Sequence, residues 1–168
     1  MLLRPAQPED ALDVARVHVR SWQAAYRGLL PDEYLNGLRP EDRAQRYDFA
    51  NPDPLAPQTL VAIEDETICG FATTSASHDL SLPSHGELCA LYVDPAHWRS
   101  GFGIALVAAA RGRLERLAFK HALLWVLAGN VRAERFYRND GWAADGMRRT
   151  ETMWGVQVDE VRYLRELG

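Results

Sequence analysis

One stretch in the middle of the chain limits the fold more than any other, because a strand-like run passes through a short glycine-containing loop into a helix-like run. The stretch reads Leu91-Tyr92-Val93-Asp94-Pro95-Ala96-His97-Trp98-Arg99-Ser100-Gly101-Phe102-Gly103-Ile104-Ala105-Leu106. Backbone N–H groups in the first turn of a helix lack partners inside the helix and lie at the positive end of its dipole. Glycines there let an anion approach the backbone without a Cβ in the way. The stretch therefore predicts an anion site, whose usual occupant is a phosphate.

Other interpretations of this stretch remain open when it is taken alone. The Walker motif G-x-x-x-x-G-K-[ST] is absent from the sequence. A dinucleotide fingerprint requires a small residue at the position of Leu106 and should follow the first strand of a βαβ unit. A helix start without any ligand also fits. Arg99 would add a charge-assisted contact to a bound phosphate.

A second segment, from Leu124 to Trp142, repeats the change from strand to helix. Asn130 is a suitable N-cap for this helix. Asn130, Glu134 and Tyr137 are four and three positions apart, which predicts that they share one helix face. An amide and a phenol would then project side by side from a second helix.

The rest of the chain predicts a mixed α/β domain around one sheet. Strands are expected at 2–4, 59–63, 68–75, 86–93, 122–127, from 142 onward and at 158–164, and helices at 8–28, in two pieces within 31–49, at 101–119 and at 131–139. The proline-rich run at 51–57 predicts a loop, because neither side of it could hold a core alone. We expect residues 1–168 to form a single domain.

Composition excludes several classes of function. The chain is 47% hydrophobic and 25% charged, as is ordinary for a soluble domain, and its net charge of −4 argues against nucleic acid as the main partner. No run approaches the roughly 20 apolar residues of a membrane helix, and the first residues do not read as a signal peptide. We therefore expect a cytoplasmic protein that binds no membrane. Cys69 and Cys89 lie far apart without a ligand-spaced histidine cluster, so no metal is expected.

The two segments together resemble the GNAT superfamily of N-acetyltransferases. The first is similar to the superfamily's cofactor motif, LYVDP…(Q/R)xxGxG/A, and the second to its N..A..FY...GF segment. Residues 22–31 also resemble a stretch found in many bacterial members. The resemblance implies a mostly antiparallel mixed sheet with a central splayed parallel strand pair and helices on both faces. It further implies that acetyl-CoA is the acetyl donor and a primary amine the acceptor.

The resemblance also implies which residues bind acetyl-CoA. Backbone groups of Leu91, Tyr92 and Val93 would pair with the pantetheine arm. Amides from Arg99 to Ile104 would hold the pyrophosphate. The implied set is Leu91, Tyr92, Val93, Arg99, Ser100, Gly101, Phe102, Gly103, Ile104, Asn130, Ala133 and Tyr137. The sequence departs from the motif at Trp98, where Gln or Arg is usual, which puts that side chain's contribution in doubt.

The chemistry requires a neutral amine, because an ammonium cannot attack a thioester. An amine with a pKa near 10.4 is neutral in only about one molecule in a few thousand at pH 7, so the site needs a base, an acceptor of low pKa or a route for the proton. The Val93 N–H suits the oxyanion, and the resemblance implies that Tyr137 protonates the leaving thiolate. For Tyr137 the alternative is a packing role. Glu87 is a candidate base acting through water, because alternation places it on one strand face with Cys89, Leu91 and Val93; the alternative is a solvated carboxylate.

The acceptor side is less patterned. Trp22 and Tyr26 are expected to contact the acceptor together with Glu87, since family members build this pocket from the first two helices. Trp125 occupies the position at which protein N-terminal acetylating relatives carry a base glutamate, which favours a small-molecule amine over a protein amine. A non-catalytic acyl-CoA sensor and a nucleotide-binding regulator remain the alternatives from other classes. A homodimer also remains open.

Overall fold

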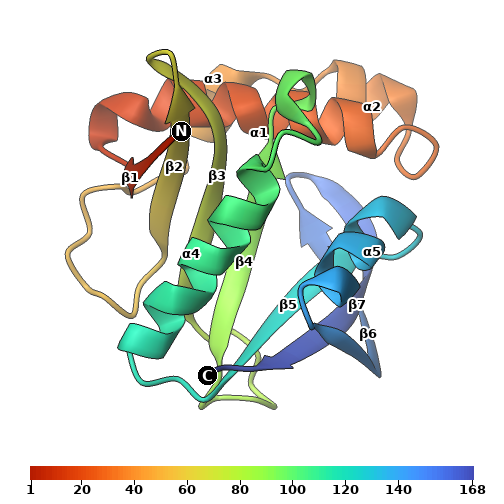
Figure 1. Cartoon of the computed structure of the whole chain (residues 1–168). Helices are drawn as coiled ribbons and strands as arrows, with labels where there is room; N and C mark the ends of the chain where they lie inside the picture. Colours follow the sequence, from red (N-terminus) through yellow and green to blue (C-terminus); the bar gives the residue numbers. More distant parts are fainter.

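The computed structural model describes residues 1–168 and contains seven strands and five α-helices (Figure 1). In chain order the elements are β1 (Leu2–Pro5), a 3-10 turn η1 (Pro8–Asp10), α1 (Ala11–Ala25), α2 (Asp32–Asn36), α3 (Pro40–Ala44), β2 (Gln58–Glu64), β3 (Thr67–Ala76), β4 (Gly86–Val93), a 3-10 turn η2 (Pro95–His97), α4 (Phe102–Arg116), β5 (His121–Leu127), α5 (Val131–Asn139), β6 (Ala143–Met153) and β7 (Val156–Glu166). The expected pattern of strands and helices is therefore present, and the differences are confined to the ends of elements.

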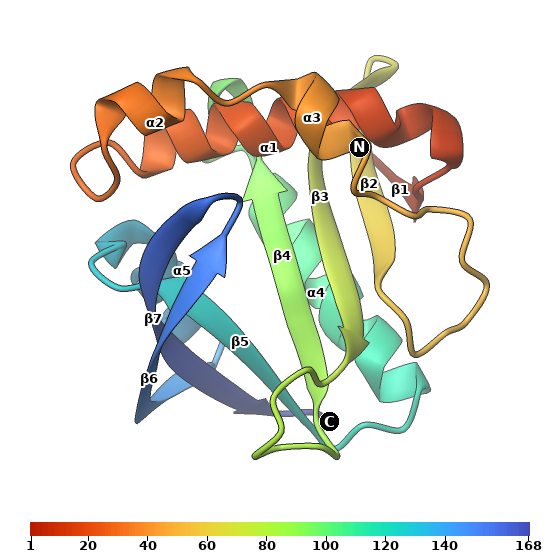
Figure 2. The same cartoon turned by 180° about the vertical axis from the view of Figure 1, so that it is seen from behind.

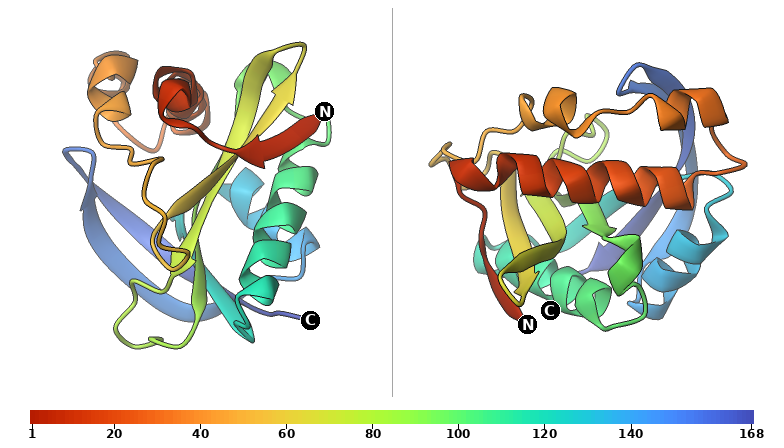
Figure 3. Two further views of the ribbon diagram at one scale, coloured as in Figure 1. Left: turned by 90° about the vertical axis from the view of Figure 1, so that its left-hand side faces the viewer. Right: turned by 90° about the horizontal axis from the view of Figure 1, so that it is seen from above.

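All seven strands form one sheet in the order β1-β2-β3-β4-β5-β7-β6, and every neighbouring pair is antiparallel except β4 and β5. Helices α1, α2 and α3 lie on one side of the sheet, and α4 and α5 lie on the other (Figure 3). This arrangement confirms the expected mixed, mostly antiparallel sheet with one central parallel pair and helices on both faces. No helix of the chain combines the length and the apolar character needed to cross a bilayer.

Apolar spacing explains how α1 and α4 attach to the sheet. Buried Val14 and Val17 of α1 pack with Val61 and Phe71 of the sheet. On the opposite side, α4 buries a stripe of residues at helical spacing: Phe102, Leu106, Val107, Ala110 and Leu114. Burying such stripes is the main favourable term in folding, and here it covers the sheet from both sides.

The parallel pair is short, and this creates the central feature of the fold. Only two positions are in register, Gly86 with Ala122 and Glu87 with Leu123. Beyond them the two strands diverge, as Figure 2 shows for β4 and β5. A Cβ on Gly86 would lie 2.8 Å from Leu114 Cδ2, so only glycine allows α4 to approach this closely at the closed end. The sheet is therefore joined at one end of the pair and open at the other.

A β-bulge changes which side chains of β4 share a face. The register with β3 shifts so that Thr73 pairs with Ala90 but Thr74 pairs with Leu88, which leaves Cys89 as an extra residue. Leu88 packs in the α4 cluster, and so do Leu91 and Val93 three and five positions later. The expected alternation of Glu87 with Leu91 and Val93 is therefore wrong, because the bulge reverses the alternation between them.

Candidate active site

A cavity of about 530 Å³ fills the opening between β4 and β5. It extends from the start of α4 to the face of the sheet that carries α1. Its wall includes residues from β4 (Leu91, Tyr92, Val93), the loop and first turn of α4 (Arg99, Gly101, Gly103, Ile104), α5 (Asn130, Ala133, Tyr137) and α1 (Trp22, Tyr26). Most of the residues expected from the sequence are thus brought together around one space. Ser100 and Phe102 do not line it, since Ser100 is exposed and the Phe102 side chain lies in the core.

Unpaired main-chain donors lie where α4 begins. Gly101 caps the helix in the left-handed region, with φ of 85°, and Arg99 precedes it with φ of 62°. None of the N–H groups of residues 99–104 donates a hydrogen bond within the chain, and the first that does is Ala105, to the Gly101 carbonyl at 3.1 Å. A positive helix end with several free N–H groups is a site for an anion. Ser100 and Phe102 can contribute to it through their backbone.

Trp98, the departure from the motif, connects the two parts of the site. Its indole N–H donates to the Val93 carbonyl at 2.8 Å, and Ser21 Oγ donates to the same oxygen at 3.0 Å. The Arg132 guanidinium lies 3.6 Å from the centre of a Trp98 ring. This contact is short enough for a cation–π interaction. A tryptophan therefore holds the end of β4 and places the positive charge of Arg132, from the second segment, beside the anion site.

The ladder between β3 and β4 decides which main-chain groups face the opening. Asp94 N–H donates to the Cys69 carbonyl at 2.8 Å, and hydrogen-bonded pairs alternate along an antiparallel ladder. Leu91 and Val93 therefore direct their N–H and C=O groups away from β3 and toward the gap, where the Val93 carbonyl accepts from Trp98 and Ser21. The expectation was wrong for the backbone of Tyr92, which pairs with Phe71 instead. Tyr92 reaches the cavity through its side chain.

Helix α5 supplies an amide and a phenol. Asn130 Oδ1 accepts a hydrogen bond from Ala133 N–H at 3.2 Å, so Asn130 caps the helix and also lines the cavity. Tyr137 is buried against the cavity, and burial, with a further contribution from Tyr92, raises the pKa of its phenol well above the usual value. Glu134 accepts a hydrogen bond from the Tyr163 hydroxyl at 2.7 Å and does not line the cavity. The Tyr137 phenol therefore stays protonated at neutral pH and is available as an acid.

The opposite end of the cavity is closed by aromatic residues. Trp22 and Tyr26, as expected, line it. The turn between β6 and β7 lies beneath α1 and α2 (Figure 2). The Tyr34 hydroxyl donates to the Trp154 carbonyl at 2.5 Å, and the Trp154 ring lies 5.1 Å from that of Trp22. These contacts join α2 to the turn and pack it against Trp22, behind this end of the cavity.

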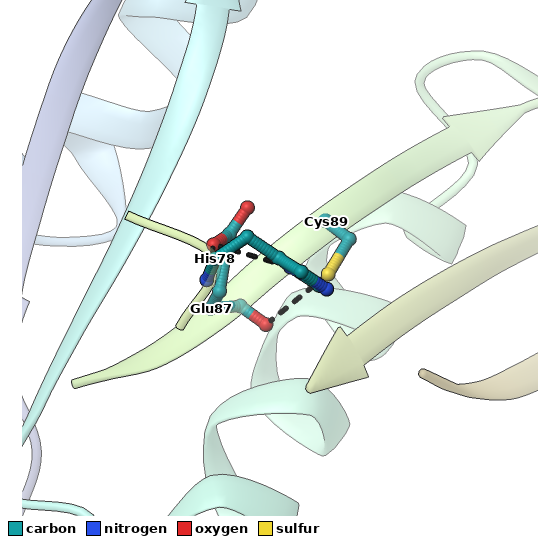
Figure 4. A group of neighbouring side chains, drawn as sticks. All are labelled: His78, Glu87 and Cys89. Carbon is teal, nitrogen blue, oxygen red and sulfur yellow. Dashed lines mark hydrogen bonds and ion pairs between the residues drawn. The ribbon is translucent and has the colours of Figure 1, made fainter. Parts of the chain in front are cut away.

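Glu87 lies outside the cavity, although the sequence made it a candidate base. Its carboxylate accepts the His78 backbone N–H at 2.8 Å and lies 3.6 Å from His78 Nδ1, beside Cys89 (Figure 4). Donor atoms of these three residues lie within 4.8 Å of one another, close enough to approach one divalent cation. Burial, reinforced by Glu87, raises the pKa of the Cys89 thiol to about 12, which disfavours the thiolate that a metal requires. The expectation that no metal is bound stays a prediction.

A buried glutamate of the last strand was missed by the sequence reasoning. Glu160 lines the cavity with only 5% of its surface exposed. Its Oε1 accepts the Arg149 Nε–H at 2.9 Å, and burial raises the pKa of its carboxyl. Strand alternation places Glu160 on the same inward face of β7 as Val158, two positions earlier. A charged residue on a buried face usually has a functional or ion-pairing role, and this could have identified it.

Comparisons with known proteins agree with this geometry. Residues 21–142 match the Acetyltransferase (GNAT) family. The chain is 30% identical over 128 residues to YuaI of Bacillus subtilis, described as an uncharacterized N-acetyltransferase, covering 76% of this chain and 72% of YuaI.

Solved structures share the fold at lower sequence identity. The PaiA N-acetyltransferase of Thermoplasma acidophilum, in complex with coenzyme A, superposes with a TM-score of 0.74 at 20% identity and covers 98% of each chain. The ribosomal-protein-alanine N-acetyltransferase of Brucella melitensis gives 0.74 at 20% identity and covers 99% of this chain and 100% of that one. The family match extends over most of the chain, from α1 to the end of α5, and includes both segments that surround the cavity. This protein belongs to the GNAT family of acetyltransferases.

Proposed function

We propose that the protein transfers an acetyl group from acetyl-CoA to a primary amine, and that the amine belongs to a small molecule. The observation that carries this proposal is the opening between β4 and β5, with the free N–H groups of residues 99–104 at one end. A diphosphate fits those donors, and an extended arm with amide groups fits the backbone of Leu91 and the N–H of Val93, which are left unpaired by β3. PaiA of Thermoplasma acidophilum was solved with coenzyme A, and YncA of Salmonella typhimurium with acetyl-CoA.

Direct attack by the amine is consistent with the residues in the cavity. The Val93 N–H faces the gap and can stabilise the oxyanion that forms as the amine adds to the thioester. Tyr137, whose raised pKa keeps it protonated, donates a proton to the departing thiolate. Cys89 lines the cavity, but the raised pKa of its thiol keeps it protonated, so it is no nucleophile.

The link between α2 and the β6–β7 turn supports a small molecule over a polypeptide. A protein segment needs an open groove, whereas the contact between Tyr34 and the Trp154 carbonyl joins α2 to the β6–β7 turn across this end. Trp125 occupies the position at which relatives that acetylate protein N-termini carry a base glutamate. A peptide acceptor is the alternative that the assay below tests directly.

The test combines calorimetry with a thiol-release assay. Purified protein should bind coenzyme A, and acetyl-CoA should yield free thiol with amines from a panel that includes small amines and peptides. The variant Tyr137→Phe should lower kcat by about 10²-fold, the usual size of an acid contribution, while the Kd of acetyl-CoA stays the same. Absence of heat with coenzyme A would refute the donor assignment. Tight binding without thiol release from any amine would favour an acyl-CoA sensor, and stabilisation by NAD or ATP alone would favour a nucleotide-binding regulator.

A further inference from the structure

We infer that Glu160 binds the ammonium group of the acceptor and takes up its first proton, and that the acceptor is a primary amine on an apolar body. The inference deepens the proposed acetyl transfer and rests on it, because the proton must be removed only if the amine attacks. It adds a residue and a substrate class to the acceptor end of the cavity.

The strand register places Glu160 on the acceptor face of the sheet. Glu160 of β7 is paired with Leu127 of β5, and residues paired directly across a ladder point to the same face. Leu127 packs with Trp22 and Tyr26 of α1, so this face is the one toward α1. The anion site and α5 lie on the other face. Glu160 therefore approaches the reacting centre from the side opposite to the donor.

The carboxylate of Glu160 has one unsatisfied oxygen. Arg149 donates to Oε1, and no group of the chain donates to Oε2. Glu160 lines the cavity and its Oε2 is not fully enclosed, so this oxygen is open to a donor that a ligand brings into the cavity. Nearby, the Trp22 side chain is buried, lines the same cavity and has no partner for its indole N–H. A free carboxylate oxygen and a free indole N–H thus line the same cavity.

The charges around Glu160 favour a cation. Glu151 of β6 and Glu87 of β4 both act on it, and Arg149 is the cation paired with it. Arg149 itself contacts two carboxylates, Glu160 at 2.9 Å and Glu151 at 3.8 Å. Tyr26 of α1 and Tyr92 of β4 also face Glu160, and burial raises the pKa of both phenols, so both remain neutral. An ammonium ion placed beside Glu160 would restore the charge balance.

Apolar side chains form the rest of this compartment. Around Glu160 the cavity is lined by Trp22, Tyr26, Leu127, Met153 and Val158. A ligand with a charged amine at one end and an apolar body matches a pocket of apolar walls with one charged group. 2-Phenylethylamine is a suitable probe, and 2-phenylethanol is its uncharged counterpart.

The protons balance over one turnover. Glu160 accepts one proton from the ammonium, and the neutral nitrogen then forms a bond to the thioester carbon. When the C–S bond breaks, Tyr137 gives its proton to the thiolate. The phenolate that results takes the second proton from the new amide nitrogen. Glu160 finally releases its proton to water, so that one proton leaves with one N-acetyl product and one free thiol.

The experiment measures the effect of Glu160→Gln on binding and turnover. With coenzyme A saturating, calorimetry at pH 7 compares the amine probe with the alcohol. Wild type should prefer the amine, and Glu160→Gln should lose this preference while its affinity for coenzyme A is unchanged. For turnover, kcat/KM should fall by about 10²-fold. Because the variant must bind an amine that is already neutral, its kcat/KM should rise about tenfold per pH unit below the amine's pKa, more steeply than in wild type.

Glu151→Gln is the matched control. It removes the same charge 3.8 Å from Arg149, but Glu151 is half exposed and does not line the cavity. It should retain turnover and most of the probe preference, because solvent screens the charge of this half-exposed carboxylate. The inference is overturned if Glu160→Gln, still binding coenzyme A normally, keeps the amine preference and rate, or if wild type does not prefer the amine. If wild type prefers the amine but never releases thiol, Glu160 remains the ammonium site and the proposed acetyl transfer fails.

Discussion

The carbonyl of Val93 at the end of β4 leads to a quantitative prediction about how the site is held. Trp98 and Ser21 each donate one hydrogen bond to this oxygen, at 2.8 and 3.0 Å. Trp98→Phe removes one donor but keeps the aromatic face that contacts Arg132. Ser21→Ala removes the other donor. Each single change leaves the oxygen with one partner and should lower the free energy of unfolding by about 0.5–1 kcal/mol.

The double variant should lose more than the sum of the two. It leaves this part-buried carbonyl without any protein partner, and an unsatisfied acceptor costs about 1–3 kcal/mol when fully buried, so the excess should be about 1 kcal/mol. Urea unfolding of wild type, the two single variants and the double variant measures this excess, provided that the denaturant slope m is the same for all four. Calorimetry with coenzyme A should show weaker binding in the double variant, because this end of β4 leads into the anion site. Strict additivity of the two losses would refute the idea that the donors act on one shared acceptor.

Two further predictions concern parts of the fold outside the cavity. Gly86→Ala places a methyl group 2.8 Å from Leu114 Cδ2, so it should cost about 1–3 kcal/mol and lower the thermal midpoint by several degrees; an unchanged midpoint in differential scanning calorimetry would contradict the packing argument. Asp10 accepts hydrogen bonds from Arg4 that hold the pKa of its carboxyl below the usual value, so this pair contributes stability above the carboxyl's unfolded pKa of about 3.9 and loses it as the pH falls through the folded pKa. Asp10→Asn should therefore be less stable than wild type at pH 7, with a difference that shrinks as the pH falls below 3.9, and a difference independent of pH in urea unfolding would be inconsistent with the ion pair.

The donor half of the site was predictable because local chemistry specifies it. A strand, two glycines and a helix start determine where free N–H groups will lie, whatever the rest of the chain does. For the same reason Asn130 could be recognised as a cap and Tyr137 as its neighbour on the helix face. These inferences require only the periodicity of one helix and the conformation of one loop.

The acceptor half was not predictable in the same way, because pairing between distant strands creates it. Glu87 was misplaced because the bulge at Cys89 is set by the register with β3, which the residues of β4 alone do not reveal. Glu160 was missed because its position depends on the pairing of β7 with Leu127 of β5. Trp98 could be identified as a departure, but its contact with Arg132 joins two segments that are far apart in the sequence.

The brevity of the β4–β5 pairing has a consequence for how this protein can diverge. The hydrogen-bonding groups that the edge of β4 offers to a ligand are peptide groups, which every amino acid except proline supplies equally. Substitutions along the edge of β4 can therefore alter volume or polarity and still leave the recognition groups in place. Solved structures with the same architecture share as little as 14% of their residues with this chain. A donor site recognised through strand geometry can persist through that degree of sequence divergence. The acceptor end depends on individual side chains, so substitutions there can change which acceptor binds.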